Sequence, residues 1–375
     1  MKKNDHWVPY VNLSKQFREE KKLLLPRIEK VLSSGKYILS DEVDKFERQI
    51  CKYNKVKFCV SVNSGTDALI LSLMSLGINA GDEVITQANS YIGSAAAINA
   101  VGAKPVFCDV YDDQTMDVED MKSKINSRTK VIMPVHLTGR MCEMDKIMRI
   151  AKKKNIKVIE DCAQSIGSTF NKKKSGTFGD IGAYSTHPLK NLNACGDGGF
   201  IITNNKKLFN YIKLKRNHGH INREKIRFFG TVSRLDSIQA VILNFRLKKL
   251  EKIITQRLKN ASLYKKYLNN FNIYYPEIRP NCRDTYHLFV VQLKNRDNLK
   301  KFLFKNKIES NIHYPIPIHL QPAAKSLGMG EGSFPVTERQ SREILTLPVN
   351  QTLVSSQIEH VAKSVNDYFE KKTKG

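Results

Sequence analysis

The sequence predicts an α/β fold, with a large domain built on a mostly parallel central sheet flanked by helices and a smaller C-terminal α+β domain. Short apolar runs alternate with helical segments between residues 55 and 205, which is typical of parallel strands buried on both faces. After residue 235 the helical segments become longer and more charged. The length of 375 residues suits one large and one small domain. We predict a large domain at 1–250, including an N-terminal arm, and a small domain at 251–375.

The first half of the chain carries the predicted strands. A helix is expected over residues 40–50, because Ser40 can cap it, acids fill its first turn, and apolar residues share one face. Apolar runs bounded by turn residues predict strands at 58–62, 83–86, 105–108, 131–135, 157–160 and 200–203. The helices predicted in the same region are 66–76, 94–100 and 144–151.

The C-terminal part has a different pattern. Residues 235–268 predict one or two long charged helices with an apolar stripe. The elements predicted after residue 270 are a strand at 287–293, a helix at 297–306, a proline-rich loop at 312–322 and a final helix at 356–371.

The net charge of +26 raises the question of a nucleic-acid partner. The lysines are spread along the chain, and no zinc finger, RNP-type aromatic motif or basic zipper accompanies them. We therefore expect no nucleic-acid partner. A positive field instead favours an anionic small molecule, such as a nucleotide sugar.

Apolar runs and cysteines limit the cellular setting. No run approaches ~18 uninterrupted apolar residues, and no apolar segment follows the two N-terminal lysines, so we expect neither a membrane span nor a secretory signal. The seven cysteines are scattered, odd in number and without a C-x-x-C pair. This pattern predicts reduced thiols in a cytoplasmic protein and no metal site.

Lys190 and Asp161 are the candidate catalytic residues. Lys190 lies between Ser185 and a glycine-rich turn, and Asp161 ends the apolar run at 157–160. One amine, one carboxylate at a strand end, and nearby hydroxyls are what a pyridoxal phosphate (PLP) enzyme needs. Opposite charges ~3 Å apart at an effective dielectric of ~20 attract by roughly 5 kcal/mol before desolvation, so Asp161 could hold a pyridinium. The alternative is that Asp161 caps a helix starting at Cys162.

A second set of residues suits an anion. Ser64, Gly65 and Thr66 join a predicted strand to a helix start, where free amides and the helix dipole attract a phosphate. Ser185 adds a hydroxyl, and Gln164 lies one helical turn beyond Asp161 if a helix begins there. Simple helix capping, local backbone bonding by Ser185 and a surface position for Gln164 remain the alternatives.

These motifs, in their order along the chain, resemble the DegT/DnrJ family of nucleotide-sugar aminotransferases, which are PLP enzymes of fold type I in the aspartate aminotransferase superfamily. The resemblance runs nearly end to end. The matching segments are Ser33–Leu39, Val62–Leu69, Gly81–Thr86, Glu160–Ser165, Gly176–Asp180, His187–Leu192, Gly196–Gly199, Ser233–Ala240 and Ile312–Ala323.

The resemblance implies a role for each matching residue. Lys190 would be the Schiff-base lysine and proton carrier, and Asp161 would face the pyridine nitrogen. Tyr91 would stack on the cofactor ring, although a packed surface aromatic is the alternative. The implied cofactor-binding residues are Gly65, Thr66, Tyr91, Asp161, Gln164, Ser185 and Lys190. The resemblance also implies a homodimer with active sites at the subunit interface.

Two positions depart from the family pattern. Val232 stands where an asparagine commonly reaches the neighbouring subunit's cofactor phosphate. One hydrogen bond to a charged group, about 1.5–3 kcal/mol, is then absent unless Thr231 or Ser233 substitutes. Phe228 and Phe229 replace residues that are frequently polar or histidine, which leaves the substrate contacts of this loop open.

The resemblance implies transfer of an amino group from L-glutamate to C3 of a dTDP-3-keto-6-deoxyhexose, in amino-sugar biosynthesis for a surface polysaccharide or glycoside. The expected substrate contacts are His187, His313, Tyr314 and His319. A rigid, proline-stiffened loop is the alternative for residues 312–322. Other substrates are a 4-keto UDP-, dTDP- or GDP-sugar and a UDP-3-keto sugar. A PLP-dependent dehydratase is less favoured, because such members carry histidine in place of Lys190, and a DNA-binding regulator is suggested only by the charge.

Overall fold

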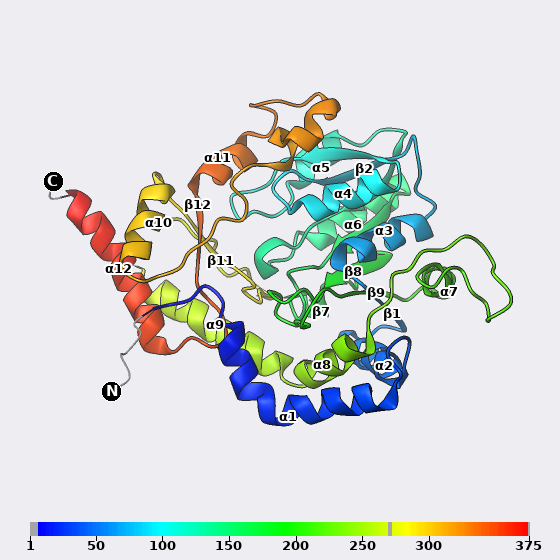
Figure 1. The fold of residues 1–375 in the computed structure, drawn as a ribbon. Helices are drawn as coiled ribbons and strands as arrows, with labels where there is room; N and C mark the ends of the chain where they lie inside the picture. Colours follow the sequence, from blue (N-terminus) through cyan, green and yellow to red (C-terminus); the bar gives the residue numbers. More distant parts are fainter. Residues whose placement is uncertain (1–6, 269–271, 374–375) are drawn as a thin grey trace.

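The computed structural model describes residues 7–268 and 272–373. Figure 1 shows an α/β body around a central sheet and a smaller region formed by the C-terminal helices, with α9 leading from one to the other. No helix in the described ranges combines the length and the apolar character needed to cross a membrane.

The central sheet has seven strands in the order β1-β9-β8-β5-β4-β2-β3. Its strands are β1 (Phe58–Val62), β2 (Glu83–Gln87), β3 (Lys104–Cys108), β4 (Thr129–Met133), β5 (Lys157–Asp161), β8 (Ile181–Ser185) and β9 (Gly199–Thr203). Only β9 runs antiparallel to its neighbours in this sheet. The prediction of a mostly parallel sheet is therefore confirmed.

Helices cover both faces of the sheet, which explains why the strands are apolar throughout. The helices of this body are α1 (Leu13–Ser34), α2 (Asp41–Asn54), α3 (Gly65–Ser75), α4 (Ile92–Ala100), α5 (Val118–Ser123), α6 (Met144–Lys154), α7 (Lys206–Lys215) and α8 (Ser237–Leu247). Ile159 of β5 packs with α3 and α4, whereas Val158 packs with α6. Successive residues of β5 thus face opposite layers.

A second core unites the small region. Its elements are α9 (Leu250–Tyr267), β11 (Phe289–Gln292), α10 (Arg296–Lys305), β12 (Ile344–Leu347) and α12 (Ser355–Thr373). The helix α11 (Pro335–Glu343) lies outside this core, and its first amides donate to Asp109 of the large body. Val8 belongs to this core and pairs with Ile308, so the N-terminal segment lies in the small region. Ile318 and Phe334 instead pack against Phe107 of the large body. The N-terminal segment around Val8 and the segment 318–334 therefore each cross from one region to the other. The domain boundary at residue 250 stays a prediction.

Short elements complete the structure. They are the two-residue strands β6 (Thr169–Phe170), β7 (Lys173–Lys174) and β10 (Cys282–Arg283), and the 3-10 turns η1 (Leu137–Gly139), η2 (Ile318–Leu320) and η3 (Pro322–Leu327). The strand β6 pairs with both β7 and β10, which joins the start of the small region to the loop after β5.

Candidate active site

Asp161 is the last residue of β5 and faces the α3–α4 side of the sheet. Its Oδ2 accepts a hydrogen bond from Ser94 Oγ at 2.9 Å, and its Oδ1 accepts one from Ala163 N at 3.1 Å. Burial raises the pKa of Asp161, while the two hydrogen bonds and Lys190 act in the opposite direction. Each carboxylate oxygen therefore has one donor and retains capacity for another.

Lys190 lies in the turn that follows β8. Its backbone N–H donates to the carbonyl of His187 at 2.8 Å, which fixes the turn. The side chain is half-buried. Burial lowers the pKa of Lys190 to about 8, and the negative charge of Asp161 partly opposes that effect. About a tenth of the amine is therefore unprotonated at pH 7, far more than for an ordinary lysine, as a nucleophile or proton carrier requires.

The start of α3 forms an anion cradle against the end of β8. Ser64 caps the helix by accepting from Asp67 N at 3.0 Å, so the capping alternative is correct for its hydroxyl. The amides of Gly65 and Thr66 precede the first intrahelical bond and stay free for an anion. A Cβ on Gly65 would lie 2.6 Å from the Cβ of Ser185. Only glycine permits this approach of the helix start to Ser185.

An aromatic wall closes another side. Tyr91 caps α4 and is 58% exposed, and its ring centroid lies 5.7 Å from that of Tyr314. Gln164 Nε2 donates to the Tyr314 hydroxyl at 3.5 Å, and Gln164 Oε1 accepts from Thr138 N at 2.7 Å. The helix considered after Asp161 is wrong, because residues 162–168 form turns. Gln164 reaches the site from this turn.

Two of the predicted sugar contacts lie beside these groups. His313 Nδ1 bonds with Thr346 Oγ1 at 2.9 Å, and its ring stacks on Tyr10. Burial, together with the charge of Lys190, lowers the pKa of His313 to about 4, so this imidazole is neutral. His187 is exposed in the Lys190 turn, and burial and Lys190 lower its pKa as well.

The prediction of a sugar contact at His319 is wrong. The side chain is 1% exposed, and its Nε2 pairs with Glu338 Oε1 at 3.0 Å. Its ring packs edge-on against Phe334. Glu338 also accepts from the amides of Gly332 and Phe334. His319 therefore holds the 318–338 segment together and presents no surface to a ligand.

His136, Glu160 and Cys162 form a compact buried cluster of potential metal ligands. The Glu160 carboxylate already accepts from His136 Nε2 and from three backbone amides. His136 Nδ1 accepts from Cys142 N at 3.2 Å. Both imidazole nitrogens and both carboxylate oxygens are thus engaged, and the cluster is a structural anchor.

Sequence reasoning missed three residues that shape the site. Ser94 holds Asp161, and the sequence offered no signal for it beyond its position in a small-residue helix. Thr138 positions Gln164 through its backbone, which leaves no side-chain signal. Arg257 lines a cavity together with Lys190. The sequence did contain one indication of Arg257, a charged residue on the buried face of α9. The other residues of that face are Leu250, Ile254, Asn260, Ala261 and Tyr264.

The arrangement fits PLP. Asp161 is a buried carboxylate with spare acceptor capacity, and no salt bridge in the described part of the chain involves it, which suits a pyridinium nitrogen. The free amides beside Gly65 suit a phosphate. Lys190, whose charge acts on Asp161, supplies an amine of lowered pKa. The expected ring partner Tyr91 is exposed and available for stacking.

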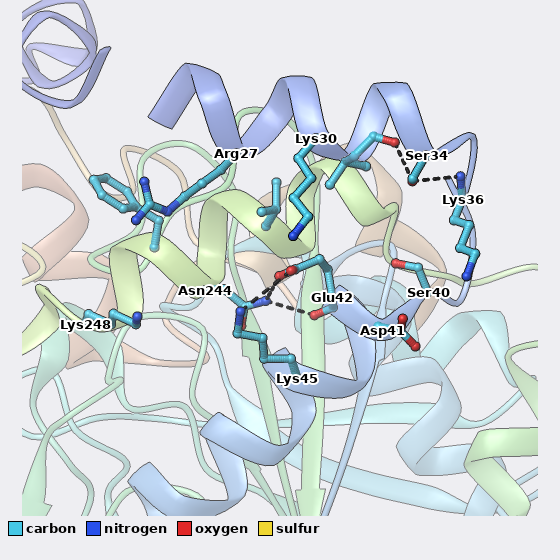
Figure 2. Close-up of a pocket in the computed structure, with 13 residues that line it drawn as sticks. Arg27, Lys30, Ser34, Lys36, Ser40, Asp41, Glu42, Lys45, Asn244 and Lys248 are labelled. Carbon is cyan, nitrogen blue, oxygen red and sulfur yellow. Dashed lines mark hydrogen bonds and ion pairs between the residues drawn. The ribbon is translucent and has the colours of Figure 1, made fainter. Parts of the chain in front are cut away.

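Figure 2 shows a different cavity, of about 400 Å³, between α1, the start of α2 and α8. Its wall carries the cations Arg27, Lys30, Lys36, Lys45 and Lys248. Glu42 accepts two bonds from Asn244 Nδ2 across this wall. Among the described residues, its lining includes no predicted site residue, so we do not place the chemistry there.

Residues 18–366 match the DegT/DnrJ/EryC1/StrS aminotransferase family. The chain belongs to this family. The aminotransferases of this family are PLP-dependent, and a related structure of a putative sugar aminotransferase from Streptococcus pneumoniae is a PLP form. The predicted family, enzyme class and cofactor are confirmed.

Individual relatives of the chain are sugar aminotransferases. The dTDP-3-amino-3,6-dideoxy-alpha-D-galactopyranose transaminase of Aneurinibacillus thermoaerophilus is 40% identical, covering 96% of this chain and 99% of the relative. The crystal structure of S. venezuelae DesV in complex with a ketimine intermediate has a TM-score of 0.94 at 35% identity and covers 96% and 98%. NtdA from Bacillus subtilis with bound PMP has a TM-score of 0.91 at 28% identity and covers 97% and 86%. The predicted fold class is confirmed by these likenesses.

Proposed function

We propose that this aminotransferase moves an amino group from L-glutamate to C3 of a dTDP-3-keto-6-deoxyhexose in amino-sugar biosynthesis. The observation that carries the proposal is the end-to-end, 40% identity to a dTDP-3-amino-sugar transaminase. The lysine at position 190 agrees with amino transfer rather than dehydration. The net charge of +26 favours an anionic nucleotide sugar.

In this proposal, PLP supplies the electron sink that stabilises negative charge next to the reacting amine. Asp161 pairs with the ring nitrogen and keeps it protonated. Lys190 Nζ carries the proton between the donor's α-carbon and the cofactor, which its pKa of about 8 supports. Gly65, Thr66 and Ser185 hold the phosphate.

The ring and the sugar contact a second group of residues. We propose that Tyr91 stacks on the ring and that Gln164 bonds its hydroxyl. Tyr314 and the neutral His313 contact the keto sugar from the 312–322 loop, and His187 contacts it from the Lys190 turn. The contact between the Tyr91 and Tyr314 rings supports a shared aromatic wall for both ligands.

We also propose a homodimer with the site at the subunit interface. The loop after α7 extends away from the body in Figure 1, and it exposes large apolar side chains. Phe229 is 96% exposed, and Ile221 and Ile226 are each 58% exposed. A partner subunit that covers this loop would remove these side chains from water.

Val232 lies in the same loop and is 52% exposed. If this loop approaches the partner's cofactor phosphate, Val232→Asn restores the missing hydrogen bond and tightens PLP binding about 10- to 100-fold. PLP dissociation is measured by equilibrium dialysis. Equal PLP dissociation in both proteins would refute this role.

A cytoplasmic location is part of the proposal. All seven cysteines are free thiols, which agrees with a reducing compartment.

The direct test adds glutamate and a panel of 3-keto and 4-keto nucleotide sugars to the PLP-loaded enzyme and follows 2-oxoglutarate release. The dTDP-3-keto-6-deoxyhexoses should give the highest kcat/KM. A higher kcat/KM for a 4-keto sugar or for a UDP-3-keto sugar would contradict the substrate assignment. Loss of water without any amino donor would instead indicate a dehydratase.

A further inference from the structure

Arg257 is a buried arginine without a carboxylate partner. Five arginines in the described ranges are buried, and four of them form ion pairs. The paired arginines are Arg140 with Asp113 and Asp284, Arg216 with Glu47, Arg246 with Glu20, and Arg296 with Asp297. Arg257 is 5% exposed, and no ion pair of the described residues includes it. A buried cation without an anion is costly, and an anionic ligand would offset that cost.

The guanidinium also has donors to spare. Its Nη1 donates to the carbonyls of Tyr286 and His287, each at 3.1 Å, and its Nη2 donates to Gln351 Oε1 at 3.0 Å. Its Nε has no partner among the described residues. A guanidinium has five N–H groups, so two remain after these three bonds. Two free N–H groups on one planar guanidinium suit a carboxylate.

The surroundings of Arg257 are positive. Burial lowers the pKa of Arg257 to about 10, so the group stays charged at neutral pH. Burial lowers the pKa of His287, and the charges of Lys190 and Arg257 lower it further, so that imidazole is neutral. The Tyr10 hydroxyl is the group that raises the pKa of Arg257. Burial raises the pKa of Tyr10 itself, so this hydroxyl is neutral and does not offset the charge of Arg257.

Two small cavities are lined by Arg257 together with residues of the candidate active site. One, of about 10 Å³, is lined by both Arg257 and Lys190. The other, of about 40 Å³, is lined by Arg257, His287 and His313. A single water needs roughly 10–15 Å³ by this measure. The larger cavity therefore has room for a carboxylate group but not for a nucleoside diphosphate.

We propose that Arg257 binds a carboxylate group of the amino-acid donor and holds that donor beside Lys190. The proposal rests on the proposed transamination and adds a binding residue for its first half-reaction. Arg257 and Gln351 form one wall of this subsite, and the Lys190 turn forms another through Leu189. The keto sugar, which has no carboxylate to offer, does not use Arg257.

The test compares Arg257→Met and Arg257→Lys with the wild-type PLP enzyme. Lys259→Met is the matched control, because Lys259 is an exposed cation on the same helix. Succinate, an unreactive dicarboxylate, is titrated into each protein by calorimetry, and dTDP is titrated separately. Arg257→Met removes the charged hydrogen bonds between the guanidinium and the succinate carboxylate, so the Kd for succinate should rise about 10- to 100-fold. Arg257→Lys keeps the charge without the planar pair of donors, so it should show a smaller rise.

The control and the second ligand decide the outcome. Lys259→Met should bind succinate like the wild type, and dTDP affinity should be unchanged in every variant. Unchanged succinate affinity in both Arg257 variants would overturn the proposal, as would an equal loss in Lys259→Met or a loss of dTDP affinity alone. If Arg257→Met does not fold, Arg257→Lys decides by the same criterion.

A kinetic readout separates this inference from the proposed function. In single-turnover experiments, glutamate should convert the bound cofactor with a raised half-saturation constant in Arg257→Met, while the keto sugar reacts normally with the amine form. If no keto sugar reacts in any protein but succinate binding still depends on Arg257, the proposed substrate fails and the carboxylate site stands.

Discussion

Glu160 and Asp161 are neighbours on β5, yet their carboxylates lie on opposite faces of the sheet and accept different numbers of hydrogen bonds. Glu160 faces the α6 side, where each of its oxygens accepts two hydrogen bonds, from His136 and from the amides of Gly176, Phe178 and Gly179. Asp161 faces the α3–α4 side, where each oxygen accepts only one. The difference separates a carboxylate that stabilises the fold from one that keeps capacity for a ligand.

The same contrast distinguishes the buried arginines. Arg140 is neutralised by Asp113 and Asp284, whereas Arg257 has no carboxylate partner among the described residues and adjoins the Lys190 turn. Polar groups left incomplete inside a protein are costly. Asp161 and Arg257 both lie near Lys190, and we interpret their spare hydrogen-bonding capacity as room for cofactor and substrate.

Among substitutions on the α3–α4 side of the sheet, Lys190→Ala should reduce activity the most. It removes both the covalent link to PLP and the proton carrier, so kcat should fall by at least about 10⁴-fold and the visible absorbance of the bound cofactor should change. Lys174→Ala is the matched control, because burial also lowers the pKa of Lys174 to about 8, while its Nζ bonds the carbonyl of Tyr53 away from the site. Undiminished turnover in Lys190→Ala would exclude its role.

The neighbouring substitutions Asp161→Asn and Glu160→Gln should separate the two faces directly. Asp161→Asn should lower kcat about 10²- to 10³-fold, as loss of one stabilising charge does elsewhere, with little loss of stability in the PLP-free protein. In Glu160→Gln, an NH₂ group replaces one carboxylate oxygen and cannot accept the hydrogen bonds that buried backbone amides donate there. The free energy of unfolding should therefore fall by about 2–4 kcal/mol. Steady-state kinetics and urea denaturation measure the two effects. A destabilised Asp161→Asn with normal kcat would reverse our assignment.

Gly65→Ala should weaken the phosphate cradle. The added Cβ would lie 2.6 Å from Ser185 Cβ, so the helix start must move away from β8. We expect a PLP Kd raised about tenfold, roughly 1.4 kcal/mol, measured by dialysis of the holoenzyme. Combining Gly65→Ala with Ser185→Gly removes the clash, and affinity should recover in part. No change in Gly65→Ala would mean that the phosphate binds elsewhere.

The pH dependence of PLP capture should show the smallest effect. A Lys190 pKa of about 8, instead of 10.5, makes the reactive free amine rise about tenfold between pH 7 and 9 and then level off. Removing the charge in Asp161→Asn should lower the midpoint, because that charge raises the pKa of Lys190. Stopped-flow absorbance on the PLP-free protein measures both. A rise that continues to pH 10 would show an ordinary lysine.

Much of the fold could be predicted because it follows local patterns. The strands expected at 58–62, 83–86, 105–108, 157–160 and 200–203 lie within one residue of the observed bounds at each end. The long α1 was not predicted, because Pro26 lies within it and its outer face exposes leucines that blur the periodicity. The split of 235–268 into α8 and α9 was left open in the sequence and is now resolved.

The site was predictable where a motif marks it and not where contacts join distant segments. Lys190 and Asp161 stand in recognisable motifs, and the structure brings them together. His319 lies in a motif as well, but Glu338, nineteen residues away, engages it in the interior. Ser94 and Arg257 meet the site from helices whose sequences carry no catalytic pattern.

By itself, the sequence determined the alternating strands and helices, the lysine and carboxylate proposed for the chemistry, and the glycine at the start of α3, because these depend on periodicity and residue type close along the chain. Only the tertiary structure decided the strand order, the saturation of Glu160, the incompleteness of Asp161, and the unpaired state of Arg257. Those properties depend on which donors and charges from distant segments lie within about 3 Å of each group, because hydrogen bonds form only over such short distances.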